Sequence, residues 1–76
     1  MTWTSISEYE TGNFAILKFI NRNGKEMQIG VIQYPDNTFN AILVDADMKT
    51  SVLLIERHKG TWEEARKWCE KYAEKL

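Results

Sequence analysis

A short basic run, Arg57-His58-Lys59-Gly60-Thr61, leads directly into the amphipathic segment at the end of the chain. Unpaired amides and the helix dipole at a helix N-terminus attract anions, so this turn predicts contact with a phosphate or a nucleic-acid backbone. The candidate contacts are Arg57, His58, Lys59 and Thr61. Glu63 and Glu64 follow in the expected first turn and supply negative charge themselves. The alternative is therefore a solvated turn with ordinary helix capping.

An acidic stretch from Asp45 to Thr50 opens like a calcium loop, and Glu56 stands at its twelfth place. Lys49, however, occupies a ligand place, and Thr50 stands at the sixth place, where such loops carry glycine. The residues after Thr50 have the apolar pattern of a strand. A polar hairpin loop is the better interpretation, and we expect no metal site.

His58 is the only histidine of the chain and Cys69 the only cysteine. With no second histidine, neither a metal cage nor a cysteine–histidine pair with an orienting third group can be assembled. Cys69 lies on an apolar stripe beside Trp68 and Tyr72, which favours a buried and unreactive thiol. We therefore expect a protein that is not an enzyme and needs no cofactor.

Three aromatic residues outside the last segment have no obvious place: Trp3, Tyr34 and Phe39. On an open sheet face they could stack nucleic-acid bases, as in sheet-based binders of single strands. The alternative is that they complete a small core that needs every large side chain.

Composition describes one small globular domain over residues 1–76. Of its residues 43% are hydrophobic, and ten Lys and Arg against eleven Asp and Glu give a net charge of −1. Strong nucleic-acid modules carry a basic excess or a basic face, and here the overall excess is missing. One cysteine cannot form an internal disulfide, and no leader-like segment opens the chain, so we expect a cytoplasmic protein. No apolar run approaches the roughly 20 residues of a membrane span.

The last segment has the pattern of a helix with its start signal. Thr61 is a good N-cap, and Glu64, three residues later, completes a capping box. Apolar residues then recur at helical spacing: Trp62, Ala65, Trp68, Cys69, Tyr72, Ala73 and Leu76.

Turn signals divide the rest of the chain into short strands, of which Asn23-Gly24 is the strongest hairpin signal. The expected strands are Thr2–Glu10, Asn13–Asn21, Lys25–Tyr34, Thr38–Val44 and Ser51–Arg57. Short connections favour antiparallel neighbours. We predict an α+β fold: a four- to five-stranded antiparallel meander with one C-terminal helix packed on one face.

Several strands are apolar on both faces, for example Phe14–Ile20 and Ala41–Val44. One helix covers one face only, so we expect self-association, with two copies paired through the other face. The alternative is a strongly curled sheet whose open side is sealed by Thr2–Glu10. Gly30, in the middle of a strand, could mark a bulge or a sharp bend that assists curling.

The helix start Gly60–Trp68 resembles the Thr-x-x-Glu-Ala-x-x-Trp helix start of small phage and mobile-element proteins that place a helix after a short sheet. It is also similar to the arm-binding domain of tyrosine integrases. The first resemblance implies a small protein that binds or blocks a partner protein. The second implies DNA binding through a basic sheet, whereas the basic residues here are scattered among acids: Lys18, Arg22, Lys25 and Lys49. A non-enzymatic binding module is therefore the leading hypothesis, and a nucleic-acid-binding domain is the alternative.

Overall fold

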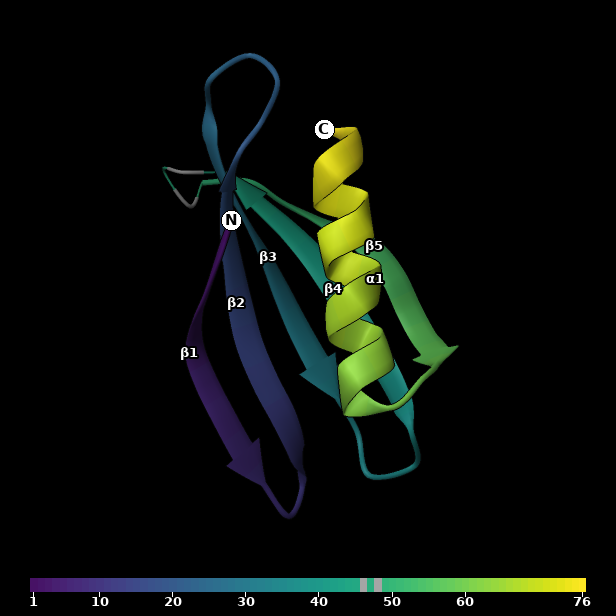
Figure 1. The fold of residues 1–76 in the computed structure, drawn as a ribbon. Helices are drawn as coiled ribbons and strands as arrows, with labels where there is room; N and C mark the ends of the chain where they lie inside the picture. Colours follow the sequence, from purple (N-terminus) through teal and green to yellow (C-terminus); the bar gives the residue numbers. More distant parts are fainter. Residues whose placement is uncertain (46, 48) are drawn as a thin grey trace.

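The computed structural model describes residues 1–45, 47 and 49–76 and shows one open five-stranded sheet with a helix across one face (Figure 1). The strands follow one another in the order β1-β2-β3-β4-β5, and every neighbouring pair is antiparallel. This confirms the predicted α+β meander with a C-terminal helix. The elements are β1 (Thr2–Tyr9), β2 (Gly12–Ile20), β3 (Glu26–Gln33), β4 (Thr38–Asp45), β5 (Ser51–Lys59) and α1 (Trp62–Lys75).

The strand β1 forms one edge of the sheet, beside β2, and does not fold over the face that α1 leaves uncovered. The alternative in which the N-terminal segment seals the open side is therefore wrong. The register explains why: Trp3 pairs with Leu17 and Thr4 with Ile16, so β1 extends the sheet sideways. The second face of the sheet stays uncovered by any described part of the chain.

Both edge strands are interrupted by a residue with positive φ. Ser5 has φ 54° in β1, where the register shifts between Thr4 and Ser7. Arg57 has φ 51° in β5, and the pairing of β4 with β5 also shifts on either side of Ala41. Bulges and charged residues on edge strands hinder pairing with the edge of another sheet. Association through a face is thus less obstructed than association through an edge.

The core lies between α1 and the covered face of the sheet. Its helical side is made of small residues, since Ala65, Cys69 and Ala73 are the buried positions of α1. They permit the helix to approach the sheet closely. The larger Trp62, Trp68 and Tyr72 are half-buried and flank this contact. The buried apolar residues of the sheet are Ala15, Leu17, Phe19, Ile29, Val31, Phe39 and Ala41.

The predicted capping box is confirmed. The Thr61 hydroxyl accepts a hydrogen bond from the Glu64 amide at 3.3 Å, and the Glu64 carboxylate accepts one from the Thr61 amide at 3.2 Å. We expect Thr61→Ala to cost about 1 kcal/mol and to lower the melting temperature by several degrees. Thr61→Asp should be nearly neutral. Thermal melts of the two variants test this, and equal melting temperatures for Ala and Asp would contradict it.

Burial raises the pKa of the Cys69 thiol from 9.0 to about 12, with a smaller contribution from the negative charge of Glu70. The folded protein therefore holds the thiol neutral. Stability is unaffected below about pH 9 and falls as the pH rises further, because the unfolded thiol ionises first. Urea melts at about pH 8 and pH 10 should show a larger loss for the native sequence than for Cys69→Ala. Equal losses would contradict the assignment.

Candidate functional site: the open face of the sheet

The face of the sheet opposite α1, here called the open face, carries an apolar centre. Alternation along β2, β3 and β4 directs Ile16, Gly30 and Ile42 to this face, where the three residues pair in one row across the sheet. Together they line a hollow of about 210 Å³, which is apolar apart from one glutamine side chain. Its lining is Phe14, Ile16, Gln28, Gly30, Ile32, Ile42 and Val44.

Gly30 forms the floor of this hollow. The prediction of a bulge at Gly30 is wrong, because the register runs without a shift from Ile16 through Gly30 to Ile42. A Cβ atom built there would meet only Phe14 Cε2, at 4.0 Å, which is ordinary contact. The backbone conformation of Gly30 does not call for glycine either, since the positive-φ glycines are Gly12 and Gly24. The folded monomer therefore has room for a side chain where the sequence provides none.

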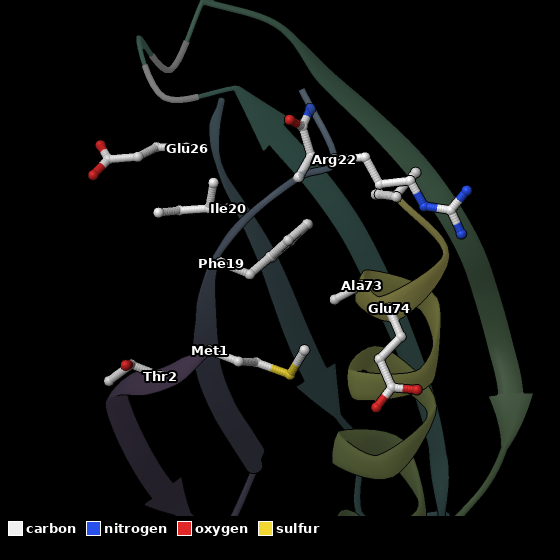
Figure 2. Close-up of a pocket in the computed structure, with 10 residues that line it drawn as sticks. Met1, Thr2, Phe19, Ile20, Arg22, Glu26, Ala73 and Glu74 are labelled. Atoms are coloured by element: carbon white, nitrogen blue, oxygen red, sulfur yellow. The ribbon is translucent and has the colours of Figure 1, made fainter. Parts of the chain in front are cut away.

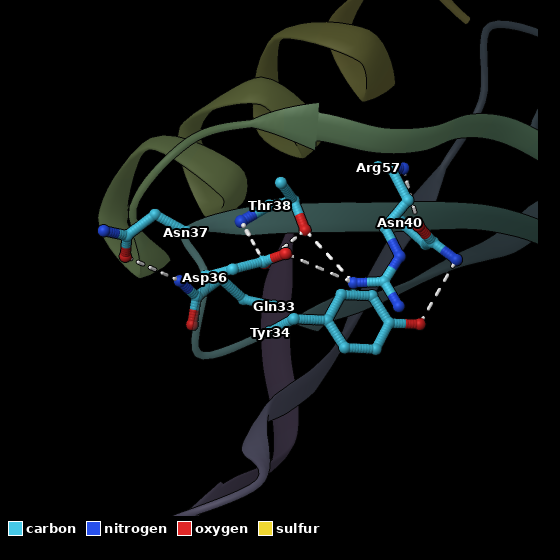
Figure 3. A network of polar contacts seen from close by, with 7 residues as sticks. All are labelled: Gln33, Tyr34, Asp36, Asn37, Thr38, Asn40 and Arg57. Atoms are coloured by element: carbon cyan, nitrogen blue, oxygen red, sulfur yellow. Dashed lines mark hydrogen bonds and ion pairs between the residues drawn. The ribbon is translucent and has the colours of Figure 1, made fainter.

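A polar network borders the open face at the Tyr34 end of β3 (Figure 3). The Arg57 guanidinium lies 3.7 Å from the centroid of the Tyr34 ring, and its backbone amide donates to Asn40 Oδ1 at 2.8 Å. Arg57 Nη1 donates to the Thr38 hydroxyl at 3.3 Å and lies 3.7 Å from Asp36 Oδ2. The ring of Tyr34 and the Arg57 side chain are thus held together by contacts from three segments.

The Thr38 hydroxyl, which donates to Asp36 at 2.6 Å, is the main cause of a lowered pKa for the Asp36 carboxyl. Arg57 adds a smaller effect in the same direction. Asp36 is therefore ionised at neutral pH beside the Arg57 cation. The opposite end of the open face carries the exposed Lys18 and Glu26, one on β2 and one on β3.

The structure separates Arg57 from the other three residues predicted as an anion site, whereas Lys59 lines one hollow with His58 and another with Thr61. Arg57 belongs to the network on the open face, whereas the His58 ring packs on Phe39 on the helix side, 5.4 Å between centroids. His58 and Lys59 are not in a turn, as the sequence suggested, but in β5, where they pair with Phe39 and Thr38. Alternation in a strand sends neighbours to opposite faces, which is why Arg57 and His58 diverge.

On the helix side, His58 and Lys59 border a crevice of about 270 Å³ between β5 and α1, here called the basic crevice. Its apolar wall is Phe39 and Trp68, and two lysines of the helix complete its rim. The lining residues are Phe39, His58, Lys59, Glu64, Lys67, Trp68 and Lys71. Sequence reasoning missed the helical lysines. Their spacing of four residues, beside a tryptophan, is the signal that could have indicated a shared surface.

The three aromatic residues do not form a common stacking surface. Phe39 is only 1% exposed, so its assignment as a surface aromatic is wrong: it lies in the core against Trp68, with 6.0 Å between ring centroids. Trp3 pairs with Leu17 and packs against the core on the helix side. Of the three, Tyr34 alone lies on the open face, where the Arg57 guanidinium covers its ring.

A third hollow, of about 480 Å³, lies between the end of α1 and the start of the sheet (Figure 2). Phe19 and Ala73 face one another across it, with the exposed Met1 at its mouth. The charged groups of Arg22 and Glu26 point away from its centre. Half of its lining residues are polar or charged, but the charged groups of Arg22 and Glu26 do not converge, so the hollow lacks the convergent polar groups that orient a ligand.

Asp45, at the start of the acidic stretch, makes its polar contacts within the chain. Asp45 ends β4, accepts a hydrogen bond from the Thr50 hydroxyl at 2.6 Å and lies 3.6 Å from Lys25 Nζ. Glu56 is an exposed residue of β5, and residues 46 and 48 of the loop lie outside the described part of the chain. Within that part, three or more His, Cys, Asp or Glu residues do not gather anywhere in a way that could hold a metal ion. The described helix is too short and too polar to cross a membrane.

Comparison with known proteins gives no relative. The chain matches no protein-family model, no curated protein and no solved structure. The resemblance of residues 60–68 to phage and integrase domains stays a prediction.

Proposed function

We propose that this protein is a non-catalytic interaction module whose binding surface is the open face. The observation that carries the proposal is Gly30. Glycine in the middle of a strand weakens it and is typical of a place where another molecule approaches closely. Since the monomer has room for a side chain at Gly30, the glycine is best explained by a partner that occupies the hollow above it.

The chemistry of the open face supports a protein partner. Phe14, Ile16, Ile32, Ile42 and Val44 form an uncharged apolar centre, and polar groups stand at both ends. An apolar centre with a polar rim is the usual anatomy of a protein–protein interface. The resemblance to small phage proteins adds the expectation that binding blocks the surface of the partner.

A photo-crosslinker tests this proposal. Benzoylphenylalanine in place of Lys18, an exposed residue on the rim of the open face, should form a covalent adduct with a protein chain in cells that produce the protein. The matched control carries the same group in place of Lys75, an exposed lysine in the last turn of the helix. We expect adducts from position 18 only. If position 18 gives no adduct, or the same adducts as position 75, the open face is not the interaction surface.

Nucleic-acid binding is the second candidate function, and the basic crevice is the observation that favours it. Lysines of β5 and α1 line the crevice together with Trp68, which combines phosphate attraction with an aromatic surface. Thr61 does not line the crevice, and its hydroxyl accepts the capping hydrogen bond from the Glu64 amide. Glu64 also lines the crevice and reduces its positive charge.

Anisotropy of a labelled oligothymidylate tests the second function. Binding should weaken steeply with salt and should be reduced by Lys71→Glu, because Lys71 lines the basic crevice. Lys75→Glu makes the same change of charge one helical turn away and should have little effect. Binding that is equally sensitive to both variants would indicate unspecific attraction and would contradict a site in the crevice.

A further inference from the structure

We infer that the partner of the open face is a second copy of this chain, packed sheet against sheet about a two-fold axis that passes beside Gly30 and runs across the strands. This inference rests on the proposed function of the open face and adds the identity and the orientation of its partner. The positions of the charged residues at the two ends of the face carry it.

Gly30 lies midway between the two ends of β3. Glu26 is four residues before it, at one end, and Tyr34 is four residues after it, at the other, beneath the Arg57 guanidinium. A two-fold axis that runs across the strands at Gly30 reverses the strand direction of the second copy. It therefore places Glu26 of each copy above Tyr34 and the Arg57–Asp36 ion pair of the other, so that a Glu26 carboxylate meets an Arg57 guanidinium twice.

The other two-fold arrangement has its axis parallel to the strands. That axis keeps the strand ends together and places Glu26 opposite its own copy, and Arg57 opposite its own copy. Like charges across an interface exclude wrong arrangements, and opposite charges favour the correct one. Glu26 and Arg57 thus favour the axis that runs across the strands, although each of them lies beside a residue of opposite charge, Lys18 at one end and Asp36 at the other.

The Arg57 side chain is suited to this contact. Its Nη1 is used by Thr38 and Asp36, whereas its Nε and Nη2 make no hydrogen bond to the described residues. Glu26 is exposed and has no ion pair within the described part of the chain. The Glu26 carboxylate of a second copy could therefore bind the Arg57 guanidinium, and Glu26 would lose no ion pair of its own chain.

The edges of the sheet support pairing through the face. Ser5 and Arg57 distort the two edge strands, which hinders the alternative of a continuous ten-stranded sheet. Five strands of eight or nine residues, spaced about 4.8 Å apart, give a face of roughly 650 Å². This is below the roughly 800 Å² per partner of a standard interface, so we expect a weak dimer in the micromolar range.

Sedimentation equilibrium from about 5 to 500 µM tests the inference. The mass should rise from 8.9 kDa toward twice that value over this range. Glu26→Arg should weaken association about tenfold, because it removes two attractive contacts and places two cations together. Glu8→Arg is the matched control, because it makes the same change of charge at an exposed residue of β1. Glu8 pairs with Asn13 of β2. The control variant should leave association unchanged.

The charge exchange decides the orientation. Arg57→Glu alone should weaken association, and the double variant Glu26→Arg with Arg57→Glu should restore it to within about threefold, because each pair is rebuilt with its charges reversed. If Arg57→Glu does not fold, the association of Glu26→Gln is measured at several salt concentrations instead. Its association should then no longer depend on salt. A mass of 8.9 kDa at every concentration, equal effects of Glu26→Arg and Glu8→Arg, or failure of the exchange would overturn the inference.

These outcomes are distinguishable from failure of the proposed function. If the chain sediments as a monomer but the crosslinker at position 18 captures a different protein, the open face is an interaction surface and self-association is wrong. If position 18 captures nothing, both proposals fail.

Discussion

Replacement of Phe39 by alanine should lower the free energy of unfolding by about 3–5 kcal/mol, a large part of the stability of so small a domain. The Phe39 ring is 1% exposed and lies between the helix and β5, where it contacts Trp68 and His58. Its removal leaves a cavity at the junction of the two layers. Gly60, whose Cβ would lie 2.8 Å from Phe39 Cε1, shows how tightly this junction is packed.

Phe14→Ala is the matched control, because it deletes the same ring from the open face of the same sheet. Phe14 is half-buried, so its loss should cost clearly less stability than the loss of Phe39. It should instead weaken association. Urea melts of the two variants compare the costs. Equal midpoints would show that the open face is buried in the folded protein and would contradict the assignment of the two faces.

The Phe39 result also marks a limit of sequence reasoning. Both faces of β2 are apolar, with Ala15, Leu17 and Phe19 on one and Phe14 and Ile16 on the other. Hydrophobicity alone does not say which face the helix covers. The difference lies in size, because α1 presents Ala65, Cys69 and Ala73 and approaches a face that contains Ala15 and Ala41. Close packing depends on the side chains of both surfaces, so the sequence of one strand does not show which of its faces the helix covers.

The helix and the order of the strands were predictable because their signals are local. A capping box and an apolar stripe define α1, and short turns require antiparallel neighbours. The separation of Arg57 from His58 was not predicted, because the expected strand ended at Arg57. Its extension to Lys59 depends on pairing with Thr38 and Phe39, which are about 20 residues away. The bulges at Ser5 and Arg57 were not predictable either, because they depend on how neighbouring strands pair. A residue other than glycine gives no sign of a bulge in the sequence.

The open face and its hollow were partly predictable. Residue counting indicated a second apolar face and a need for a partner, and the structure shows such a face uncovered by any described segment. The role of Gly30 was not predictable, because a glycine within a strand has three common explanations, a bulge, a sharp bend or a close approach. The unshifted register excludes the bulge at Gly30, and the proposed function rests on the close approach.

Replacement of Gly30 by valine should therefore change stability and association in opposite directions. The new side chain has space in the monomer, and a β-branched residue is preferred over glycine in a strand, so the free energy of unfolding should rise by about 0.5–1 kcal/mol. The same side chain fills the hollow where the partner is expected. Because overpacking costs about 1–3 kcal/mol, association should weaken roughly 10- to 100-fold.

Gly60→Ala is the control for the Gly30 variant, because its Cβ would lie 2.8 Å from a carbon of Phe39, and it should destabilise the fold. Urea melts and sedimentation, carried out on the same samples, separate the two effects. A structural role for Gly30 would make Gly30→Val less stable, as Gly60→Ala is. A Gly30→Val protein that is more stable and associates as tightly as the native chain would show that nothing binds above the hollow. Greater stability combined with weaker association is the result that the proposed interaction surface requires, because the same side chain would then fit the monomer and obstruct the partner.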